Sequence, residues 1–427
     1  MNEKFVKLGL RPADILLPRD CDMTRWAVVA CDQFTSQPEY WEAADRIAGD
    51  APSALRLILP EIGLGVEDLD LHIDRIDHTM DDYLARGIFK TYEESLFYVE
   101  RLQSDGAVRR GIIAAMDLEE YDYTPGSGSL FRATEDKISD RLPPRVCVHR
   151  NASLELPHVL LLLDDPTRSC IEPLAAETDR MELLYDFDLM LGGGHLKGWR
   201  LTEEQMDAFA DALEVLASPS VMIKKYGPLA GIFPLLCAVG DGNHSLAAAK
   251  TCYEEQKKVT PPEKWADLPS RYALVEVVDL HDDALQFEAI HRVVFGVDPQ
   301  DLLDAFMEFY PNARNGLGVG HTITYTWAGG SGHLTVPNPR AQLEIGTLQN
   351  FLDAYIQKNG GEVDYIHGED VVDALGARPG NIGFKLPSLR KDQLFKTVIC
   401  DGVLPRKTFS MCQAVDKRYY VEARKIK

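Results

Sequence analysis

The chain has 427 residues, of which 45% are hydrophobic and 26% charged, so it can bury the cores of two or three domains. Lys and Arg number 45 against 67 Asp and Glu, which gives a formal net charge of −22. This charge repels a nucleic-acid backbone, so nucleic-acid binding along the whole chain is not expected. It still permits a local cationic pocket for one small anion.

The eight cysteines include no Cys-x-x-Cys motif, and a chain of this length needs no disulfides to be stable. The first residues lack the apolar core of a signal peptide. The apolar run 159–163 is much too short to cross a bilayer. We therefore expect a cytoplasmic protein with reduced thiols and no membrane partner.

The first part of the chain has the pattern of an α/β protein. The apolar run 26–31 is typical of a buried strand ending at Asp32, with a helix beginning near Pro38. Further elements are expected as a helix over 67–87 and a hairpin of strands 95–101 and 110–116. Residues 123–129 are rich in turn formers and predict a loop.

In the middle of the chain, helical and strand-like patterns alternate. The expected elements are a strand over 159–163, a glycine-rich turn over 191–199, a helix over 202–216, a strand over 233–239, a tight turn over 240–243, a helix over 245–257 and a strand over 271–280. The last third predicts an α+β arrangement. Its elements are a helix over 299–310, a strand pair across 328–330 and a helix over 348–357. We expect a mixed α/β (α+β) fold with regions at 1–130, 131–296 and 297–427.

The sequence Asp241-Gly242-Asn243-His244-Ser245 follows a predicted strand and opens a predicted helix. The first turn of a helix leaves N–H groups unpaired, and the helix dipole adds positive charge there, so this arrangement can hold a phosphate-type anion. Gly242 allows close approach, Asn243 and Ser245 can cap the helix or bind the anion, and His244 can carry a proton. The alternative is a capped helix with a structural glycine. The spacing matches neither a Walker A loop nor a dinucleotide fingerprint.

Other polar groups are compatible with a site, each with a plainer alternative. Asp164 and Asp165 end a predicted strand and could bind Mg²⁺, or form a turn, and Asp32 also ends a strand. Arg132 and Glu135 could form an ion pair or face one pocket. Lys197 lies in a glycine-rich turn that could fold over a ligand or could simply be the tip of a hairpin. His291 and Arg292 could supply a proton carrier and a cation, or could be surface residues. The zinc motifs His-x3-His and His-Glu-x-x-His are missing, so zinc is not expected, nor are haem and flavin.

Several of these motifs together resemble the bacterial and archaeal family called domain of unknown function 1015. The resemblance runs over nearly the whole chain. It rests on Leu10-Arg11-Pro12, the strand ending at Asp32, Phe131 to Glu135, Leu156-Pro157-His158 to Pro166, Asp241 to Ser245, Glu288 to Arg292, and Leu404-Pro405-Arg406-Lys407. The family name implies no activity. It does suggest that Arg132, Glu135, His244 and His291 converge, with Lys407 among the ligand-binding residues.

The turn at Asp241 also resembles that of the sulfiredoxin and ParB group, whose members hold nucleotide phosphates there. Activities in that group include phosphorylation of free serine and of a cysteine sulfinate, and hydrolysis of CTP. The resemblance implies a similar strand–turn–helix core and a nucleotide, ATP or ADP. Ser245 stands where that group usually has arginine, so Arg132, Lys197 or Arg292 would have to supply the cation.

These patterns lead to the hypothesis of an enzyme that transfers a phosphoryl group to or from a small hydroxyl metabolite such as serine, that is, a kinase or phosphatase using Mg²⁺. His244 would be the acid, base or phosphate donor, and Asp241 a metal ligand or base. Glu135 would orient Arg132 or activate the hydroxyl, while Arg132 and Arg292 neutralise charge. Two alternatives remain: a regulator that binds a metabolite without chemistry, and a nucleic-acid partner like ParB, which the net charge disfavours.

Overall fold

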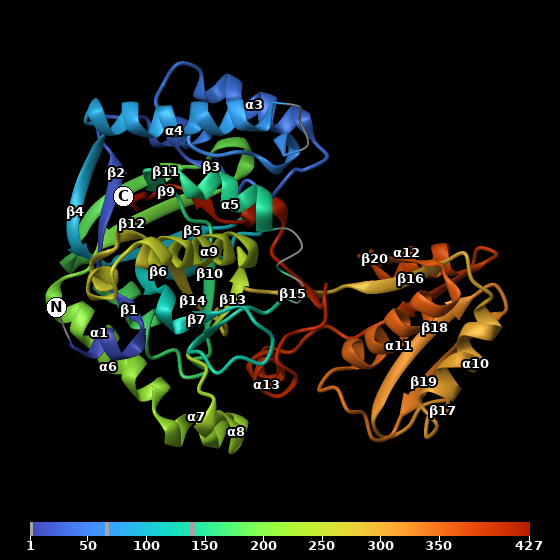
Figure 1. Cartoon of the computed structure of the whole chain (residues 1–427). Coiled ribbons are helices and arrows are strands. Elements are labelled where there is room, and N and C mark those ends of the chain that lie inside the picture. Colours follow the sequence, from blue (N-terminus) through green and yellow to red (C-terminus); the bar gives the residue numbers. More distant parts are fainter. Residues whose placement is uncertain (1–2, 65–67, 136–137, 139–141) are drawn as a thin grey trace. The chain divides into compact units, whose positions relative to one another are not determined.

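The structure is a computed structural model of the chain, and it describes residues 3–64, 68–135, 138 and 142–427. The chain forms two compact units. The first comprises Met1–Leu285 and Cys412–Lys427, and the second comprises Gln286–Met411. Each unit is built on its own sheet with helices against it, which makes the protein a mixed α/β protein, as the sequence predicts (Figure 1).

A mixed sheet of ten strands, counted over the described residues, organises the first unit. Its order is β11 (Glu182–Asp188), β12 (His195–Arg200), β5 (Phe97–Leu102), β6 (Val108–Asp117), β14 (Tyr272–Asp279), β10 (Leu160–Leu163), β13 (Cys237–Asp241), β8 (Phe131–Arg132) and β7 (Tyr121–Asp122), with β1 (Leu10–Arg11) paired to β6. β10 runs parallel to β14 and antiparallel to β13. Both β10 and β14 are almost fully buried, which explains why they are continuous apolar runs.

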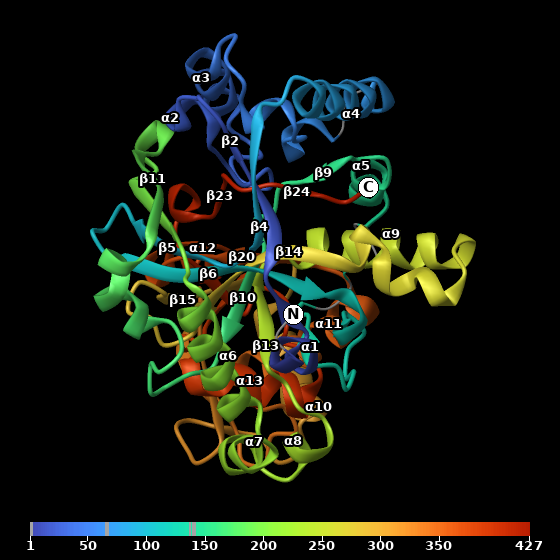
Figure 2. The same ribbon diagram turned by 90° about the vertical axis from the view of Figure 1, so that its left-hand side faces the viewer.

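Helices and a strand ribbon surround this sheet. α5 (Leu142–Arg150) packs against α9 (Asn243–Val259), and α1 (Glu3–Leu8) packs against α6 (Glu203–Ala217) (Figure 2). A capping box begins α6, in which Thr202 accepts from Gln205 N and the Gln205 side chain reaches back to Thr202. The other elements are α2 (Met23–Trp26), α3 (Pro38–Ala48), α4 (Leu69–Ala85), α7 (Pro219–Tyr226), α8 (Leu229–Ile232) and the pair β2 (Ala13–Pro18) and β4 (Phe89–Ser95).

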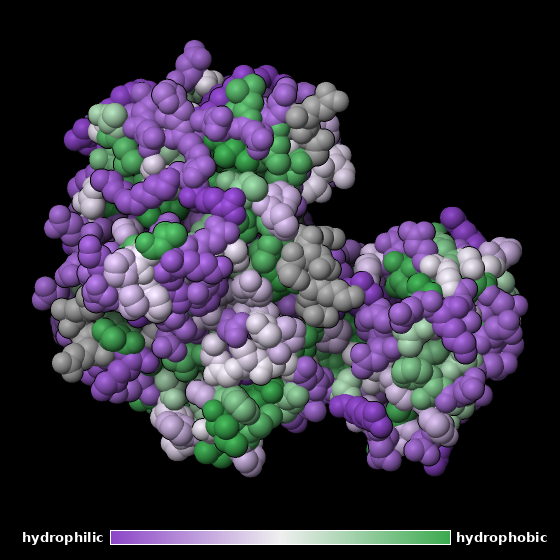
Figure 3. Space-filling view, in the orientation of Figure 1, coloured by the Kyte–Doolittle hydropathy of each residue, from purple (hydrophilic) through white to green (hydrophobic). Residues whose placement is uncertain are grey.

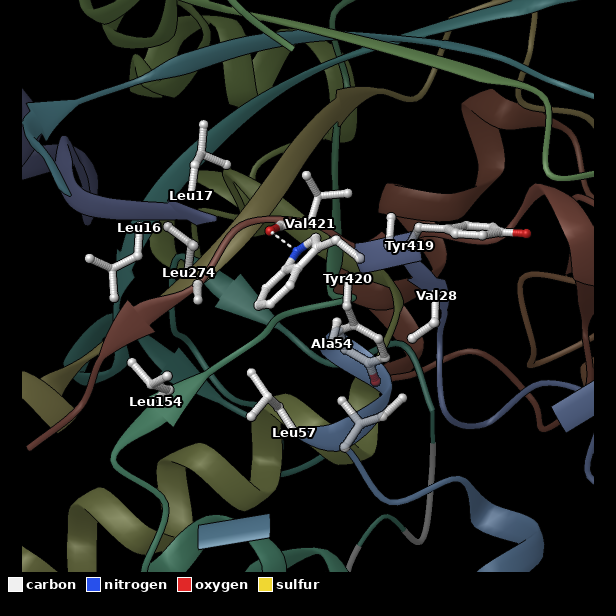
Figure 4. Packing of buried hydrophobic residues seen from close by; sticks show 14 of the residues in the cluster. Leu16, Leu17, Val28, Ala54, Leu57, Leu154, Leu274, Tyr419, Tyr420 and Val421 are labelled. Atoms are coloured by element: carbon white, nitrogen blue, oxygen red, sulfur yellow. Dashed lines mark hydrogen bonds between the residues drawn. The ribbon is translucent and has the colours of Figure 1, made fainter. Parts of the chain in front are cut away.

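The carboxyl-terminal segment Cys412–Lys427 is part of the core of the first unit. Its strand β23 (Tyr419–Tyr420) pairs with β3 (Val28–Val29), and β24 (Arg424–Lys425) pairs with β9 (Leu154–Glu155). The indole of Trp26, which is fully buried, donates to Val421 O at 2.9 Å (Figure 4). The two ends of the sequence are therefore joined around one apolar cluster.

Buried charges attach this segment to the central sheet. Arg418 donates through Nε to Glu276 on β14 at 2.8 Å and through Nη2 to Glu422 at 2.6 Å. Arg109 on β6 lies 3.4 Å from the other oxygen of Glu276. All four side chains are at most 4% exposed. Burial alone would lower the pKa of Arg418, but Glu422 and Glu276 raise it, so the guanidinium is charged.

The second unit contains a six-stranded antiparallel sheet among its described strands. The order is β17 (Arg314–Asn315), β19 (Gly330–Val336), β18 (His321–Trp327), β21 (Asn381–Lys385), β16 (His291–Phe295) and β20 (Glu362–Ile366). The helices are α10 (Pro299–Phe309), α11 (Glu344–Asn359), α12 (Glu369–Gly376) and α13 (Lys391–Asp401), and β15 (Phe287–Ala289) pairs with β22 (Phe409–Met411).

Most elements expected from the sequence are confirmed. The hairpin β5–β6, helices α6, α9, α10 and α11, and strand pair β18–β19 all form, as does α4, although the expected start at residue 67 lies outside the described residues. Three predictions were wrong in extent. Residues 26–31 contain only the short strand β3, because Asp22 caps helix α2 and this helix ends at Trp26. Residues 233–236 precede β13, and 191–199 is a hairpin tip whose second half is strand β12.

Hydrophobic residues are exposed together on α7 and α8, seen as green atoms below the main body in Figure 3. Ile223, Leu229 and Ile232 are 43%, 39% and 70% exposed. Across the described part of the chain, we find no helix with the length and apolar character needed to span a membrane.

We predict that Arg418→Ala destabilises the protein by about 3–5 kcal/mol, because it leaves Glu276 and Glu422 buried without their partner. Denaturant unfolding of the full chain measures this change. Arg46→Ala is the matched control, since Arg46 pairs with Glu42 on the surface at 4.0 Å, and it should cost less than about 1 kcal/mol. Equal losses in the two variants would contradict the anchoring role of Arg418.

Candidate functional site

The turn between β13 and α9 has the geometry expected of an anion site. β13 ends at Asp241, Gly242 adopts the left-handed conformation with φ of 79°, and α9 begins at Asn243. A Cβ at position 242 would lie 3.0 Å from the Val159 backbone, so both the conformation and the space require glycine. Among the described residues no side chain forms a capping hydrogen bond at the start of α9. The carboxylate of Asp241 accepts from Gly242 N at 3.0 Å and lies close to the positive end of the helix dipole.

Two side chains of the turn are used to hold it. Asn243 accepts from Thr134 N at 3.1 Å and donates to Thr134 Oγ1 at 3.2 Å. Thr134 Oγ1 in turn donates to Val239 O at 2.7 Å, which ties the segment after β8 to β13. Asn243 is buried, so its role here is to fix the turn.

Asp241 forms an ion pair with a lysine from the end of the chain. Lys417 Nζ lies 3.1 Å from Asp241 Oδ2, and both side chains are about 15% exposed. Burial opposes the charge on Lys417, but the carboxylates of Asp241 and Asp32 outweigh it and raise the pKa of Lys417. A permanent positive charge therefore lies beside the turn between β13 and α9.

Asp32 belongs to the same group of side chains. Its Oδ2 lies 4.0 Å from His158 Nε2, and His158 Nδ1 is 2.7 Å from Tyr420 Oη. Although burial would raise the pKa of Asp32, the nearby His158, Gln33 and Lys417 lower it. Asp32 is thus a carboxylate near neutral pH.

His158 connects this group to the helix. Its Nε2 lies 3.4 Å from Ser245 Oγ on the first turn of α9. The phenol of Tyr420 also accepts from Cys31 N at 3.2 Å. A continuous set of polar contacts therefore runs from α9 through His158 to the strand pair β3–β23.

His244 and Glu135 lie together at the rim of the turn. His244 Nδ1 is 3.7 Å from Glu135 Oε2, and the two side chains are 20% and 51% exposed. Both are open enough to meet a ligand. This pair unites two of the residues that the sequence placed in one pocket.

Arg132 has a different environment from the one expected. It lies in the short strand β8, so it does not form a helical pair with Glu135. Its Nε donates to Ser129 O, and its Nη2 donates to Phe233 O and Pro234 O. Burial lowers the pKa of Arg132 to about 10. These contacts hold backbone carbonyls, and we do not include Arg132 in the proposed site.

Lys197 is in the first unit but on another part of the sheet. It lies on β12, five strands from β13 along the sheet, which corresponds to about 24 Å at the usual strand spacing. There Lys197 Nζ pairs with Asp186 Oδ2 at 2.9 Å. Lys197 therefore serves the β11–β12 hairpin.

His291, Arg292 and Lys407 all belong to the second unit. His291 accepts from Leu386 N at 3.1 Å, and burial lowers its pKa. The buried Arg292 donates to Ile290 O and to the carbonyls of Arg406 and Lys407. Arg292 thus closes a loop inside its own unit. The convergence of His291 with the residues of the first unit stays a prediction.

Asp164 and Asp165, the expected metal ligands, take part in separate contacts. Asp164 pairs with Lys225 at 2.9 Å, contacts His281 Nε2 at 2.6 Å and accepts from Tyr226. Asp165 accepts from the backbone of Ser169 and Cys170 and organises the turn after β10. Over the residues that the structure describes, no three His, Cys, Asp or Glu side chains form a group suited to a metal ion.

Three members of the site were not recognised from the sequence: His158, Lys417 and Tyr420. His158 belongs to the Leu156-Pro157-His158 motif, but the sequence does not show which residues it contacts. Lys417 and Tyr420 lie about 175 residues beyond the turn in a basic tail, and only the pairing of β23 with β3 brings them to it. The motif around His158 was the one usable signal.

The chain belongs to the family described as Protein of unknown function (DUF1015), whose model matches residues 11–355. No curated protein matches the sequence.

Several solved structures are weakly similar. A conserved hypothetical protein from Pyrococcus furiosus shares 10% identity, covering 70% of this chain and 90% of its own, with a TM-score of 0.33. A free serine kinase mutant in complex with AMP shares 13% identity over 45% and 73%, with a TM-score of 0.32. SbnI from Staphylococcus aureus, truncated at its carboxyl terminus, shares 13% over 64% and 85%, with a TM-score of 0.27. The sulfiredoxin- and ParB-like core stays a prediction.

Asp279, at the end of β14 beside Asp165, generates a prediction about pH. Burial, with the neighbouring Glu172 carboxylate, raises the pKa of Asp279 from 3.8 to about 8. A pKa raised in the folded state means that the contribution to stability is full below the unfolded value and is lost as pH rises through about 8. Wild-type Tm should therefore fall between about pH 4 and pH 8 and level off above that range, and the Tm of Asp279→Asn should fall less.

Asp283→Asn is the control, because Asp283 is 86% exposed in its pair with Arg168. It should follow the wild-type dependence of Tm on pH. An Asp279→Asn variant with an unchanged dependence would show that Asp279 is ionised in the folded protein.

Proposed function

We propose that this protein is a phosphotransferase that holds the phosphoryl group of a nucleotide at the turn between β13 and α9 and transfers it to a small hydroxyl compound. The observation that supports the proposal is the uncapped amino terminus of α9, opened by the left-handed Gly242 and flanked by the Lys417 ammonium. Backbone N–H groups, a helix dipole and a fixed cation together suit a phosphate.

Lys417 provides the cation that Ser245 does not. Phosphoryl transfer depends mainly on positioning and on stabilising charge at the oxygens of the moving group. Lys417 is held by Asp241 at 3.1 Å and enclosed by the unit, so it needs little rearrangement to act. Asp241 orients this ammonium, whereas the sequence led us to expect Asp241 to act as a metal ligand or base.

His244 is the group placed to move the proton. In the transfer, the acceptor hydroxyl oxygen forms a bond to the terminal phosphorus while the bond from that phosphorus to the bridging oxygen of the nucleotide breaks. The hydroxyl proton passes to His244, and Glu135, at 3.7 Å, balances the resulting imidazolium. The nucleoside diphosphate or monophosphate leaves with its electron pair.

A Mg²⁺ ion fits this site only together with the nucleotide. The carboxylates of Asp32 and Asp241 already share the Lys417 charge, so the protein alone offers no cage for a cation. Mg²⁺ commonly binds through one or two carboxylates and substrate phosphates. Asp32, the more exposed of the two at 27%, is the residue that could add a ligand. The ion would supply further charge neutralisation on the phosphates.

We predict that His244→Ala binds ATP or ADP as the wild type does but transfers phosphate roughly 10²–10⁴-fold more slowly, because it lacks the proton acceptor. Calorimetry measures binding, and ³¹P NMR with Mg²⁺ and a panel of hydroxyl acceptors measures transfer. His78→Ala, at an exposed histidine of α4, is the matched control and should leave both unchanged. Binding without consumption of nucleotide by the wild type would favour a metabolite-binding regulator instead.

Lys417→Met should weaken nucleotide binding by roughly 10- to 100-fold, the range expected for one charge-assisted hydrogen bond. The effect should shrink with added salt only slightly, since the Lys417 side chain is only 15% exposed. Lys258→Met, which removes an exposed lysine at the far end of α9, is the control for net charge. If the two variants bind nucleotide equally well, the phosphate does not lie beside Lys417.

A further inference from the structure

A cavity of about 140 Å³ lies beside the first two turns of α9, inside the first unit. Its walls come from segments 57–64, α5, residues 154–159 and α9. An apolar cavity of about 150 Å³ is known to hold benzene, so this one accommodates a ligand body of roughly that size. The residues Asp241 to His244 and the charged groups Asp32 and Lys417 do not line this cavity.

The walls of the cavity are mainly apolar. Leu57, Met80, Leu154, Leu246 and Leu274 contribute side chains, and three of the lining residues, Leu57, Leu154 and Tyr420, lie close together in Figure 4 although they come from distant segments. On α9 the lining residues include Ala248 and Ala249. Their small side chains leave the space that larger residues would fill.

One group of polar side chains lines the part of the cavity formed by the first turn of α9. Ser245, His158, Tyr420 and Cys31 all line it, and the first three are joined by the contacts at 3.4 Å and 2.7 Å. Burial, with the nearby Asp32, raises the pKa of Cys31 to about 12, so its thiol is neutral. Ser245 is the third residue of the helix whose amino terminus is the proposed phosphate site. These polar lining residues therefore adjoin the first turn of α9.

The charges in the lining are paired within the protein. Glu61 pairs with Arg145, and Glu155 accepts from Arg424 at 2.6 Å. A free amino acid such as serine carries an ammonium and a carboxylate, each of which would need its own partner when desolvated. The cavity suits a neutral compound better.

We propose that the acceptor of the phosphoryl group is a neutral alcohol whose apolar body fills the cavity beside α9 and whose hydroxyl lies at Ser245 and His158. This inference rests on the proposed function for the transfer step, but the binding of the alcohol can be tested without nucleotide. Its apolar body provides affinity, and the two polar groups orient the hydroxyl toward the turn.

Calorimetry on the full chain with benzyl alcohol as the probe tests the cavity directly. Benzyl alcohol should bind and raise Tm, and toluene should bind more weakly because it lacks the hydroxyl. Ala249→Val should weaken benzyl alcohol binding by roughly tenfold, since the added methyl groups occupy the cavity. Ala247→Val is the matched control: Ala247 is buried on the same helix but packs with Ala133 and Ile138 instead. Equal binding by the two variants would overturn the proposal.

A second variant tests the cavity even if Ala249→Val does not fold. Leu57→Ala enlarges the cavity and should shift the preference from benzyl alcohol toward 3-phenylpropanol, and an unchanged preference would overturn the proposal. Adenosine that displaces benzyl alcohol would assign the cavity to a nucleobase and overturn it too. Transfer from ATP to serine without any binding of benzyl alcohol would refute the alcohol alone. Binding of benzyl alcohol without binding of ATP or ADP would refute the proposed function and leave the cavity as a site for apolar alcohols.

Discussion

The guanidinium of Arg418, held between the carboxylates of Glu276 and Glu422, fixes the end of the chain to the central sheet. Taking these charges out of water is costly, and the cost is offset only while every partner is present. Arg418 also donates to the Pro157 carbonyl, next to His158. The contact therefore sets the position of two segments at once: the tail that carries Lys417 and Tyr420, and the link between β9 and β10 that carries His158.

A buried ionic anchor has a consequence for the chemistry of the site. Lys417 is the residue directly before Arg418, so its ammonium reaches Asp241 from a backbone that cannot move far. A cation held in place before the ligand arrives avoids the entropy of ordering a flexible lysine. Arg132 and Arg292, which are 2% and 0% exposed, are instead used to hold carbonyl oxygens. Burial alone does not distinguish these roles; the identity of the partner does.

One helix, α9, combines both halves of the proposed reaction. Gly242 and the uncapped first turn suit the phosphate, and within two turns Ala248 and Ala249 leave room for an apolar body. The absence of large side chains is the common feature, because glycine admits a ligand to the backbone and alanine admits one to the side of the helix. The sequence pattern by itself indicates only a glycine turn followed by a helix rich in alanine. The cavity exists because α5 and segment 57–64 close around them.

From the sequence alone, the mixed α/β class, the β13–turn–α9 unit and most long helices could be predicted, because apolar periodicity, glycine turns and caps act over a few residues. The pairing of His244 with Glu135 was also suggested by the motifs that contain them. The partners of Asp32 and Asp241, the burial of Arg132 against carbonyls and the place of Lys197 were decided by strand order, which local patterns do not specify. Residues 412–427 belong to the first unit although the second unit, residues 286–411, precedes them in the sequence. Lys417 and Tyr420 reach the turn only in the packed structure, where the buried charge of Arg418 is satisfied.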